Sequence, residues 1–439
     1  MIAVQVKSPN SDQRLRINGY LGEEIFMFRT MGRRQLLKTG AAFGAASLAM
    51  PSILRAQGDP LVIAHLTPRT GFLGPMGEYA VMAADLAVEE INAAGGINGR
   101  ELQIVKEDSV NPQTATTKAE RLVERPEIAM IVGEISSASA LSIAQVTARA
   151  NKLFINTGAN SDTLRGKDCK RTMFHTEAQN AMYVNAEGAF FLQNDMVKGK
   201  KWFIVSADYA FGHDLRNGAL AFLERNGGEV VGDELIPTDA TDFSSYLLSI
   251  RSQAPDLVVV NLAGTQTASF FKQFGEFGLE LPIGGFDYNS SIAWATGVRD
   301  FKGTWPCIWT HQVQTDGSQA FAKAFQAKYG KPAENQAYSD YIAIRIAAEA
   351  IKATGGTDTD ALIAYLEDPA TEFDILKERK GRFDPASHQL LQEVYAVTAV
   401  DPSEAPNEWD IFTTSGALPG ADAPLEELIK GAVGGTCSF

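Results

Sequence analysis

Two short loops carry residue types that are well suited to holding a small polar molecule. One is Gly133-Glu-Ile-Ser-Ser-Ala-Ser139, and the other is Asn156-Thr-Gly-Ala-Asn160. Each loop follows an expected strand, and the first one also opens an expected helix. At the carboxyl end of a strand, backbone N–H groups and hydroxyls form a site for an anion. The alternative is helix capping, which Ser and Asn perform routinely.

Side chains that could perform catalysis are not grouped in the sequence. The histidines lie at 65, 175, 213, 311 and 388 without the spacing of a metal site, and no Gly-x-Ser-x-Gly or Walker motif occurs. The turn at 71–77 is rich in glycine but lacks Gly-x-Gly-x-x-Gly spacing. We therefore expect a protein that is not an enzyme and holds neither cofactor nor metal. A catalytic pair assembled from distant residues is the alternative.

Strands alternate with helices along most of the chain. Short apolar runs predict strands at 61–66, 101–107, 128–132 and 152–156, and again at 202–206, 229–236, 256–261, 282–285 and 305–310. Helices are expected at about 79–91, 113–125, 138–150, 179–193, 213–226, 243–253 and 266–277. This alternation predicts βαβ units and parallel sheets that have helices on both faces.

A linker near Thr176 interrupts the alternation of strands and helices, which then begins again. This predicts two similar α/β lobes. Helices at 317–329, 336–353 and 358–367 and a late strand at 393–400 are too few for a third core. They are expected to complete the two lobes, with 57–177 plus 311–385 in the first and 178–310 plus 386–439 in the second. Several crossings between lobes form a hinge, and a ligand would bind in the cleft between them.

Composition excludes several classes of protein. The 439 residues are 45% hydrophobic and 21% charged, as in ordinary globular chains. The chain has 39 Lys and Arg against 53 Asp and Glu, which gives a formal net charge of −14. An acidic chain lacks the electrostatic footprint of a nucleic-acid-binding or membrane-surface protein. Three cysteines without a Cys-x-x-Cys motif exclude a zinc ribbon.

Residues 1–56 are expected to be an export signal and not part of the fold. The pair Arg33-Arg34 precedes a weakly apolar run at 41–54, as in a bacterial signal peptide. It resembles a twin-arginine signal, although Gly32 stands where Ser or Thr is usual. Met31 is the better initiator, so 1–30 are interpreted as a mis-assigned start. An amphipathic anchor helix is the alternative.

Removal of residues 1–56 takes away eight Lys and Arg and three Asp and Glu, so the net charge becomes −19. No later apolar run is long enough to span a membrane, so a soluble, exported, periplasmic protein is expected. In an oxidising compartment two of Cys169, Cys307 and Cys437 can pair, and the sequence leaves open which two. A bond to Cys437 would fasten the terminal tail, and three free thiols are the alternative.

A longer motif carries a family resemblance. The run from Asp85 to Leu102, which contains Asn92-Ala-Ala-Gly-Gly-Ile-Asn-Gly99, resembles type I periplasmic binding proteins of ABC transporters. Their branched-chain amino acid (Leu/Ile/Val) and amide-binding subfamily matches most closely. Further matches are Ile131 to Ser139, Phe154 to Asn160 and Asp208-Tyr-Ala-Phe-Gly212. The resemblance implies an α/β fold of two Rossmann-like lobes with parallel-rich sheets, joined by three crossovers.

The resemblance also implies which residues of the first lobe contact a ligand. The family holds the ligand carboxylate and ammonium through loops that correspond to the two described first. The matching positions are Ser137, Gly158 and Asn160. Thr is common in the family where Asn160 stands, which puts specificity for amino acids in doubt. The turn at 67–77 forms a wall of the same cleft, with Met76 at a frequent aromatic position and Arg69 as a solvated rim residue or a carboxylate partner.

In the second lobe the resemblance implies an aromatic contact at Phe211 and a neighbouring one at Tyr209, for which packing within the lobe is the alternative. Thr265 should approach the ligand. Asp287 lies near the family's acid that pairs with the ligand ammonium, and Tyr288 is a second candidate because the alignment is uncertain by one residue. Tyr338 opens a helix at another aromatic position of the family.

The sequence therefore predicts the extracytoplasmic solute-binding component of an ABC uptake transporter. It would capture a small carboxylate-bearing solute, such as an amino acid, an amide or an aromatic acid, and deliver it to permease subunits. A monomer is expected. The alternative function is a ligand-sensing protein of the same fold that acts on a receptor or regulator.

Overall fold

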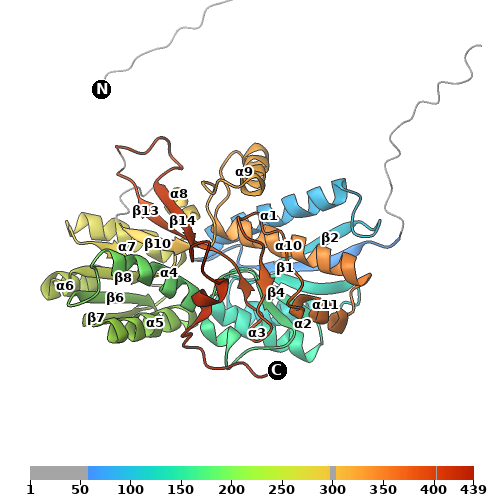
Figure 1. Cartoon of the computed structure of the whole chain (residues 1–439), viewed down its shortest axis with the longest axis horizontal. Coiled ribbons are helices and arrows are strands. Elements are labelled where there is room, and N and C mark those ends of the chain that lie inside the picture. Colours follow the sequence, from blue (N-terminus) through green and yellow to red (C-terminus); the bar gives the residue numbers. More distant parts are fainter. Residues whose placement is uncertain (1–57, 297–302, 402) are drawn as a thin grey trace, which may run out of the picture. The chain divides into compact units, whose positions relative to one another are not determined.

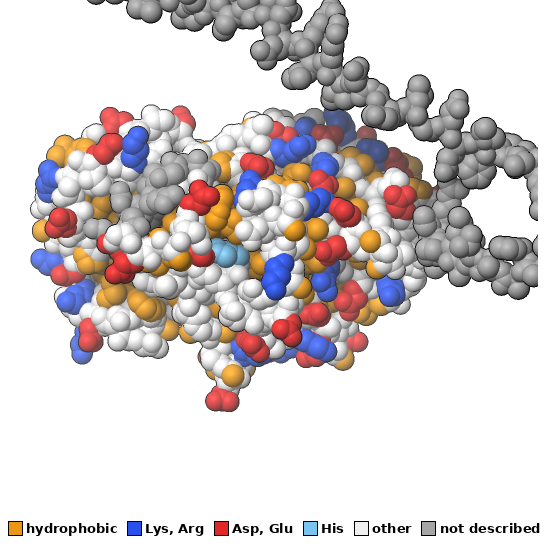
Figure 2. All heavy atoms as spheres, turned by 90° about the horizontal axis from the view of Figure 1, so that it is seen from above, with side chains coloured by type: hydrophobic (Ala, Val, Ile, Leu, Met, Phe, Trp, Pro, Cys, Tyr) orange, Lys and Arg blue, Asp and Glu red, His pale blue; other side chains and the backbone are white. Residues whose placement is uncertain are grey.

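The computed structural model describes residues 58–296, 303–401 and 403–439 (Figure 1). The proposed export signal at 1–56 lies outside these residues. Within them, no helix is both long and apolar enough to cross a membrane. On the face that Figure 2 shows, basic and acidic side chains are interspersed and do not gather into a patch of one sign.

The first lobe is built on a parallel sheet in the order β2-β1-β3-β4-β5. Its strands are β1 (Leu61–Thr67), β2 (Leu102–Asp108), β3 (Ile128–Gly133), β4 (Leu153–Asn156) and β5 (Met173–His175). Every residue of β1 is buried. Such continuous burial is expected of a strand that has helices on both faces of its sheet.

The helices of the first lobe cover the two faces of this sheet. Helix α1 (Gly74–Ala93) packs against α10 (Asn335–Thr354), and α2 (Pro112–Val123) packs against α3 (Ser137–Arg149). Alternate residues of β1 belong to two separate apolar clusters, Leu61 and Ile63 to one and Val62 and Ala64 to the other. This alternation is the period of two that a strand imposes. Helices α9 (Asp316–Tyr329) and α11 (Thr359–Glu367) complete the lobe.

The second lobe is built on a sheet in the order β14-β13-β10-β9-β8-β6-β7. Five strands are parallel: β6 (Lys201–Ala207), β7 (Glu229–Ile236), β8 (Leu257–Asn261), β9 (Ile283–Gly284) and β10 (Thr304–Cys307). Strands β13 (Val394–Ala399) and β14 (Phe412–Leu418) add antiparallel to its edge. The helices are α4 (Asn180–Gln193), α5 (Ala210–Asn226), α6 (Ser244–Gln253), α7 (Gly264–Glu276) and α8 (Ser290–Thr296).

Within the described residues, the chain crosses from one lobe to the other three times. The crossings lie between β5 and α4, between β10 and α9, and after the hairpin of β11 (Arg382–Phe383) and β12 (Leu390–Leu391). Gln389 forms a bridge with His175 at the end of β5. This bridge holds 386–391 beside the first sheet, so we propose the last crossing at 391–394 and keep the other lobe boundaries as predicted. The result is an α/β fold of two lobes with parallel-rich sheets.

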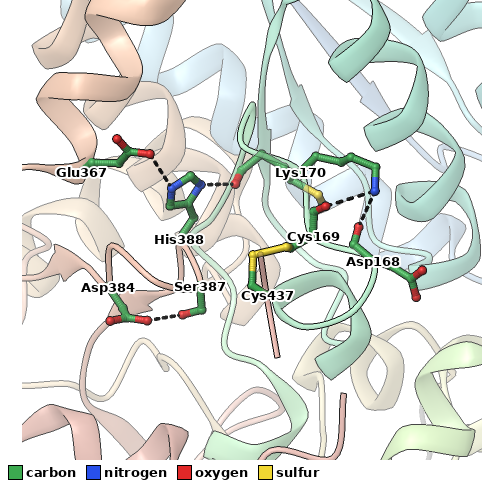
Figure 3. The surroundings of a disulfide bond; sticks show 9 residues. Asp168, Cys169, Lys170, Glu367, Asp384, Ser387, His388 and Cys437 are labelled. Carbon is green, nitrogen blue, oxygen red and sulfur yellow. Dashed lines mark hydrogen bonds and ion pairs between the residues drawn. A yellow bond between two sulfur atoms is a disulfide. The ribbon is translucent and has the colours of Figure 1, made fainter. Parts of the chain in front are cut away.

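Two short 3₁₀ helices lie beside these crossings, η1 (Asp162–Arg165) and η2 (Leu425–Ile429). A disulfide joins Cys169, shortly after η1, to Cys437 near the C-terminus, as Figure 3 shows. Cys307 is a buried free thiol. The pairing that the sequence left open is therefore Cys169 with Cys437, and the bond fastens the terminal tail.

Candidate functional site

Loops at the carboxyl ends of strands from both sheets meet between the lobes. The N–H of Thr265 at the start of α7 donates to the carbonyl of Phe72, 3.0 Å away, in the loop after β1. The Phe72 ring lies edge-on to Tyr209, which follows β6, with ring centroids 6.1 Å apart. The Ser161 hydroxyl after β4 donates to the Asp214 carboxylate on α5. These contacts define the interlobe region where a ligand is expected.

The loop after β3 is held by its own carboxyl group. Glu134 has a φ of +75° and follows Gly133, at which a Cβ would lie 2.5 Å from the Leu66 carbonyl oxygen. Glu134 Oε1 accepts from the N–H groups of Ile135 and Ser136 at 3.0 and 2.7 Å. Ser137 is fully buried, and its Oγ accepts from the Ser161 N–H at 3.3 Å.

The loop after β4 is shaped by the last residue of that strand. The Asn156 side chain both accepts from and donates to the backbone of Ala159, at 3.0 and 2.8 Å. Gln336 covers Gly158, where a Cβ would lie 2.5 Å from Gln336 Oε1. Asn160 is 6% exposed, and its Nδ2 donates to the Ala178 carbonyl at 3.1 Å. The predicted residues Ser137, Gly158 and Asn160 thus lie in two linked loops of the first lobe.

From the second lobe, Tyr209 and Phe211 stack on each other with ring centroids 5.5 Å apart. Phe211 is buried, and its carbonyl accepts from Asn180 Nδ2 at 3.1 Å. Tyr209 is half-buried and reaches the Phe72 ring of the first lobe. Thr265 has an exposed side chain, and Thr267, two residues further along α7, lines the cavity described next.

A small cavity of about 20 Å³ lies where α1 meets the loops after β8 and β9. Two predicted ligand residues of the second lobe, Asp287 and Tyr288, line it together with Met76 of the first lobe. Its volume is that of about one water-sized sphere. Gly264, with a φ of +56°, lies so close to the first lobe that a Cβ there would be 2.1 Å from the Phe72 carbonyl oxygen. The described arrangement is therefore a closed one.

Asp287 is half-buried, and the surrounding protein raises the pKa of its carboxyl group to about 7, against a smaller opposing effect of the Tyr288 N–H. A cationic ligand group beside this carboxylate would reverse the shift, because an opposite charge favours the ionised form. Asp287 therefore has the chemistry of a counter-ion for an ammonium or another donor group.

Tyr338 and Arg69 lie outside this cavity. Tyr338 is buried in the first lobe, where its hydroxyl donates to the Ile375 carbonyl at 2.7 Å and its ring stacks parallel to Trp309. Arg69 is exposed on the loop after β1, with its backbone N–H bonded to the Asp108 carboxylate. These contacts do not test whether Tyr338 or Arg69 touches a solute, and both stay predictions.

Sequence reasoning missed three buried glutamates, two of which lie near enough to Asp287 to be affected by its charge. Burial raises the pKa of Glu134, Glu177 and Glu334 to about 8 in each case, and the charge of Asp287 adds to the increase for Glu177 and Glu334. Oε2 of Glu334 has no hydrogen-bond partner. A glutamate before a helix resembles an exposed cap in the sequence, so only the tertiary structure reveals that these are buried.

The interlobe region of the described residues thus contains several buried carboxyl groups, and burial favours their neutral form. No group of three or more His, Cys, Asp or Glu side chains in the described ranges is placed to hold a metal ion. The chemistry that this geometry offers is non-covalent recognition of a small solute through backbone N–H groups, hydroxyls, aromatic faces and carboxyl groups.

Known proteins share the sequence pattern and the fold of this chain. The periplasmic binding protein family matches residues 60–404. The Leu/Ile/Val-binding protein homolog 8 of Brucella suis is 26% identical over 350 residues, which cover 76% of this chain and 86% of that protein. A periplasmic binding protein from Burkholderia mallei has a TM-score of 0.76 at 26% identity, covering 84% of this chain and 96% of its own.

A solute-binding protein of an R. palustris ABC transporter, solved with benzoate, has the same fold, with a TM-score of 0.73 at 23% identity. The match covers 82% of this chain and 96% of that one. These relatives are binding proteins and not enzymes. The family match spans most of the chain and includes both lobes, and the chain therefore belongs to the periplasmic binding protein family.

Proposed function

We propose that this chain is the extracytoplasmic solute-binding component of an ABC uptake transporter. It captures a small carboxylate-bearing solute between its lobes and delivers it to permease subunits. The observation that carries this proposal is the contact of the loop after β1 with Tyr209 and the start of α7, beside a cavity that Asp287 and Met76 line from the two lobes. A binding site assembled from both lobes couples occupancy to closure, because a bound solute adds contacts that an open state lacks.

The proposed ligand contacts divide by lobe. The linked loops around Ser137, Gly158 and Asn160 supply N–H groups and polar side chains for a carboxylate. Asp287 supplies the acceptor for an ammonium or amide donor, and Tyr209 and Tyr288 supply aromatic surface. The names of the relatives support two ligand classes, branched-chain amino acids and an aromatic acid. The Asp287 carboxyl group, which lines the cavity, favours a solute that carries a donor group.

We further propose that the protein reaches the periplasm by the twin-arginine route. The family is periplasmic, and the Arg33-Arg34 pair precedes an apolar run that is too weak for a membrane span. Replacement of both arginines by lysine should retain the precursor in the cytoplasm. Export of that variant at the normal level would contradict this route.

The experiment that tests solute capture is a thermal-shift screen of residues 57–439 with amino acids, short amides, aromatic acids and aliphatic acids. A ligand at about 100 times its dissociation constant adds about 2.7 kcal/mol to stability. We expect amine-bearing acids to raise the melting temperature of the wild type, and we expect Asp287→Asn to abolish this increase. Asp208→Asn is the matched control, because its exposed carboxylate lies in another loop of the same lobe and pairs with His213.

The outcomes separate the two parts of the proposal. An increase with acids that lack an amine, retained in Asp287→Asn, would support capture and contradict the counter-ion role of Asp287. No increase with any solute of the panel would contradict solute capture itself.

A further inference from the structure

The C-terminal segment beyond β14 contacts both lobes. Its helix η2 packs against α4 of the second lobe. There the side chain of Asn185 donates to the carbonyls of Leu428 and Lys430, at 2.8 and 2.9 Å. These bonds anchor the segment to the second lobe just before its last residues.

Three residues further on, the same segment is anchored to the first lobe. The N–H of Val433 donates to Asp162 Oδ2 at 3.1 Å, and the N–H of Lys167 donates to the Gly434 carbonyl at 2.9 Å. The backbones are in close contact here, because a Cβ on Gly434 would lie 2.1 Å from the Asp162 carbonyl carbon. Cys437 then bonds covalently to Cys169, as Figure 3 shows.

The chain segment that joins the two anchored regions is short. From Lys430 to Val433 an extended chain spans at most about 10 Å, at about 3.3–3.6 Å per residue. The disulfide closes a loop of 268 residues in sequence separation, so it ties the tail to the first lobe independently of the hydrogen bonds. While both anchors hold, the lobes cannot separate by much more at this point than they do in the closed arrangement.

Asp162 connects this segment to the lobe interface. It is 3% exposed, and its Oδ1 accepts from the N–H of Ala181 at the start of α4, at 3.0 Å. One carboxyl group thus joins η1 of the first lobe, α4 of the second lobe and the terminal tail. The preceding residue, Ser161, bonds to Asp214 on α5 and to Ser137 in the proposed ligand loop.

We propose that residues 430–439 form a fourth connection between the lobes, an interlobe strap that the Cys169–Cys437 disulfide fastens and that Asp162 couples to the hinge. The strap restricts how far the lobes open. Asp162 is a positioning residue, because it acts through the backbone of the tail and of α4. The inference rests on the proposed function in one respect, that the lobes open and close around a solute.

The test compares the full-length exported protein with Cys169→Ser/Cys437→Ser and with Asp162→Asn, all without added solute. Small-angle X-ray scattering reports the separation of the lobes, and hydrogen exchange reports the opening of the loops at 157–161 and 285–289. We expect a larger radius of gyration and at least severalfold faster exchange of both loops in the double variant. Asp162→Asn should shift both readouts in the same direction by less, because Asn keeps one of the two acceptor oxygens.

A core variant controls for general loss of stability. Leu122→Ala removes a buried side chain of α2 in the first lobe and does not touch the strap. It should lower the melting temperature and leave the radius of gyration and the exchange of the two loops unchanged. If the double variant behaves like Leu122→Ala, the disulfide is only a general stabiliser and the strap is refuted.

Reduction of the wild type gives an independent measurement that needs no substitution. Dithiothreitol converts the disulfide to two thiols and is itself oxidised to its cyclic disulfide. Addition of this dithiol should reproduce the scattering and exchange of the double variant. An unchanged closed form after complete reduction would overturn the inference. Since none of these readouts uses a solute, their outcome is separate from that of the thermal-shift screen.

Discussion

Burial makes the glutamates of the interlobe region weak acids. Glu334 illustrates the cause, because it begins α10 as a capping residue whose Oε1 accepts from the Ala337 N–H at 3.2 Å, while its Oε2 has no partner. Only 1% of its surface is exposed, and burial raises its pKa to about 8. A group whose pKa is higher in the folded than in the unfolded protein destabilises the fold as the pH rises between the two values.

Replacement of this carboxyl group by an amide should therefore change the pH dependence of stability. Glu334→Gln keeps the capping oxygen and is neutral at every pH. Near pH 4.5, where the wild-type carboxyl is still largely protonated, we expect similar melting temperatures. Toward pH 8 the variant should become the more stable one, by at most about 1.4 kcal/mol for each pKa unit crossed. A difference that is equal at both pH values in thermal unfolding would contradict the raised pKa.

At the scale of elements, the start of α7 is in close contact with the first lobe. Gly264 is in the left-handed region and faces the Phe72 carbonyl of the first lobe, and the next N–H donates to that same carbonyl. Gly275, near the end of the same helix, has open space where a Cβ would be. The first lobe thus leaves no room for a side chain at Gly264, whereas a Cβ at Gly275 would have open space around it.

Alanine substitutions at these two positions should affect solute affinity differently. Gly264→Ala places a methyl group against the Phe72 carbonyl, so the closed state should be disfavoured, and affinity for a solute identified by the screen should fall at least tenfold. Gly275→Ala should retain the affinity and raise stability by up to about 1 kcal/mol, because alanine favours the helix. Calorimetric titration measures the affinity, and equal affinities for the two variants would contradict the role of Gly264.

At the scale of the whole molecule, Arg165 connects a proposed ligand loop to two crossings. Its guanidinium is 4% exposed and donates to the carbonyls of Ala159 and Glu177, at 2.6 and 2.9 Å, and to Gln389 Oε1 at 2.9 Å. Burial lowers its pKa to about 9. The planar fork of arginine allows one side chain to reach acceptors in different segments at once.

Lysine cannot reproduce this set of bonds. Arg165→Lys should lower the stability of the fold by about 3 kcal/mol, because buried carbonyls lose their donors. Arg171→Lys is the matched control, since Arg171 forms surface ion pairs with Asp360 and Glu367 and should change stability by less than about 1 kcal/mol. Urea unfolding distinguishes the two, and similar midpoints would contradict the role of Arg165.

The sequence predicted the parts of the fold that depend on local pattern. The apolar runs at 61–66 and 256–261 became β1 and β8, because a strand buried on both faces needs consecutive apolar residues. Strand β14 was missed, since its alternation of Thr, Ser and Gly at a sheet edge resembles a loop. Short β5 and helix α8 were missed as well, because three to seven residues give too little periodicity.

Among the candidate ligand residues, the resemblance placed Met76, Asp287 and Tyr288 at positions that line the interlobe cavity, and their contact with a solute stays a prediction. Tyr338 and Thr265 do not line this cavity, and their contact with a solute stays a prediction as well. The Tyr338 hydroxyl donates to a carbonyl inside the first lobe, and the Thr265 side chain is exposed at the start of α7. The direction in which a side chain points around its helix axis depends on how the helix packs, and a motif match does not specify this direction.

The sequence by itself determined the class of fold, the two-lobed organisation, the acidic character and the family resemblance, because these follow from composition, periodicity and short motifs. Only the tertiary structure decided which cysteines pair, which glutamates are buried around Asp287, and where the C-terminal tail runs. Each of these depends on contacts between segments far apart in the chain, such as Asp162 with Val433. Burial and pairing are properties of the packed molecule, and no local pattern of residues encodes them.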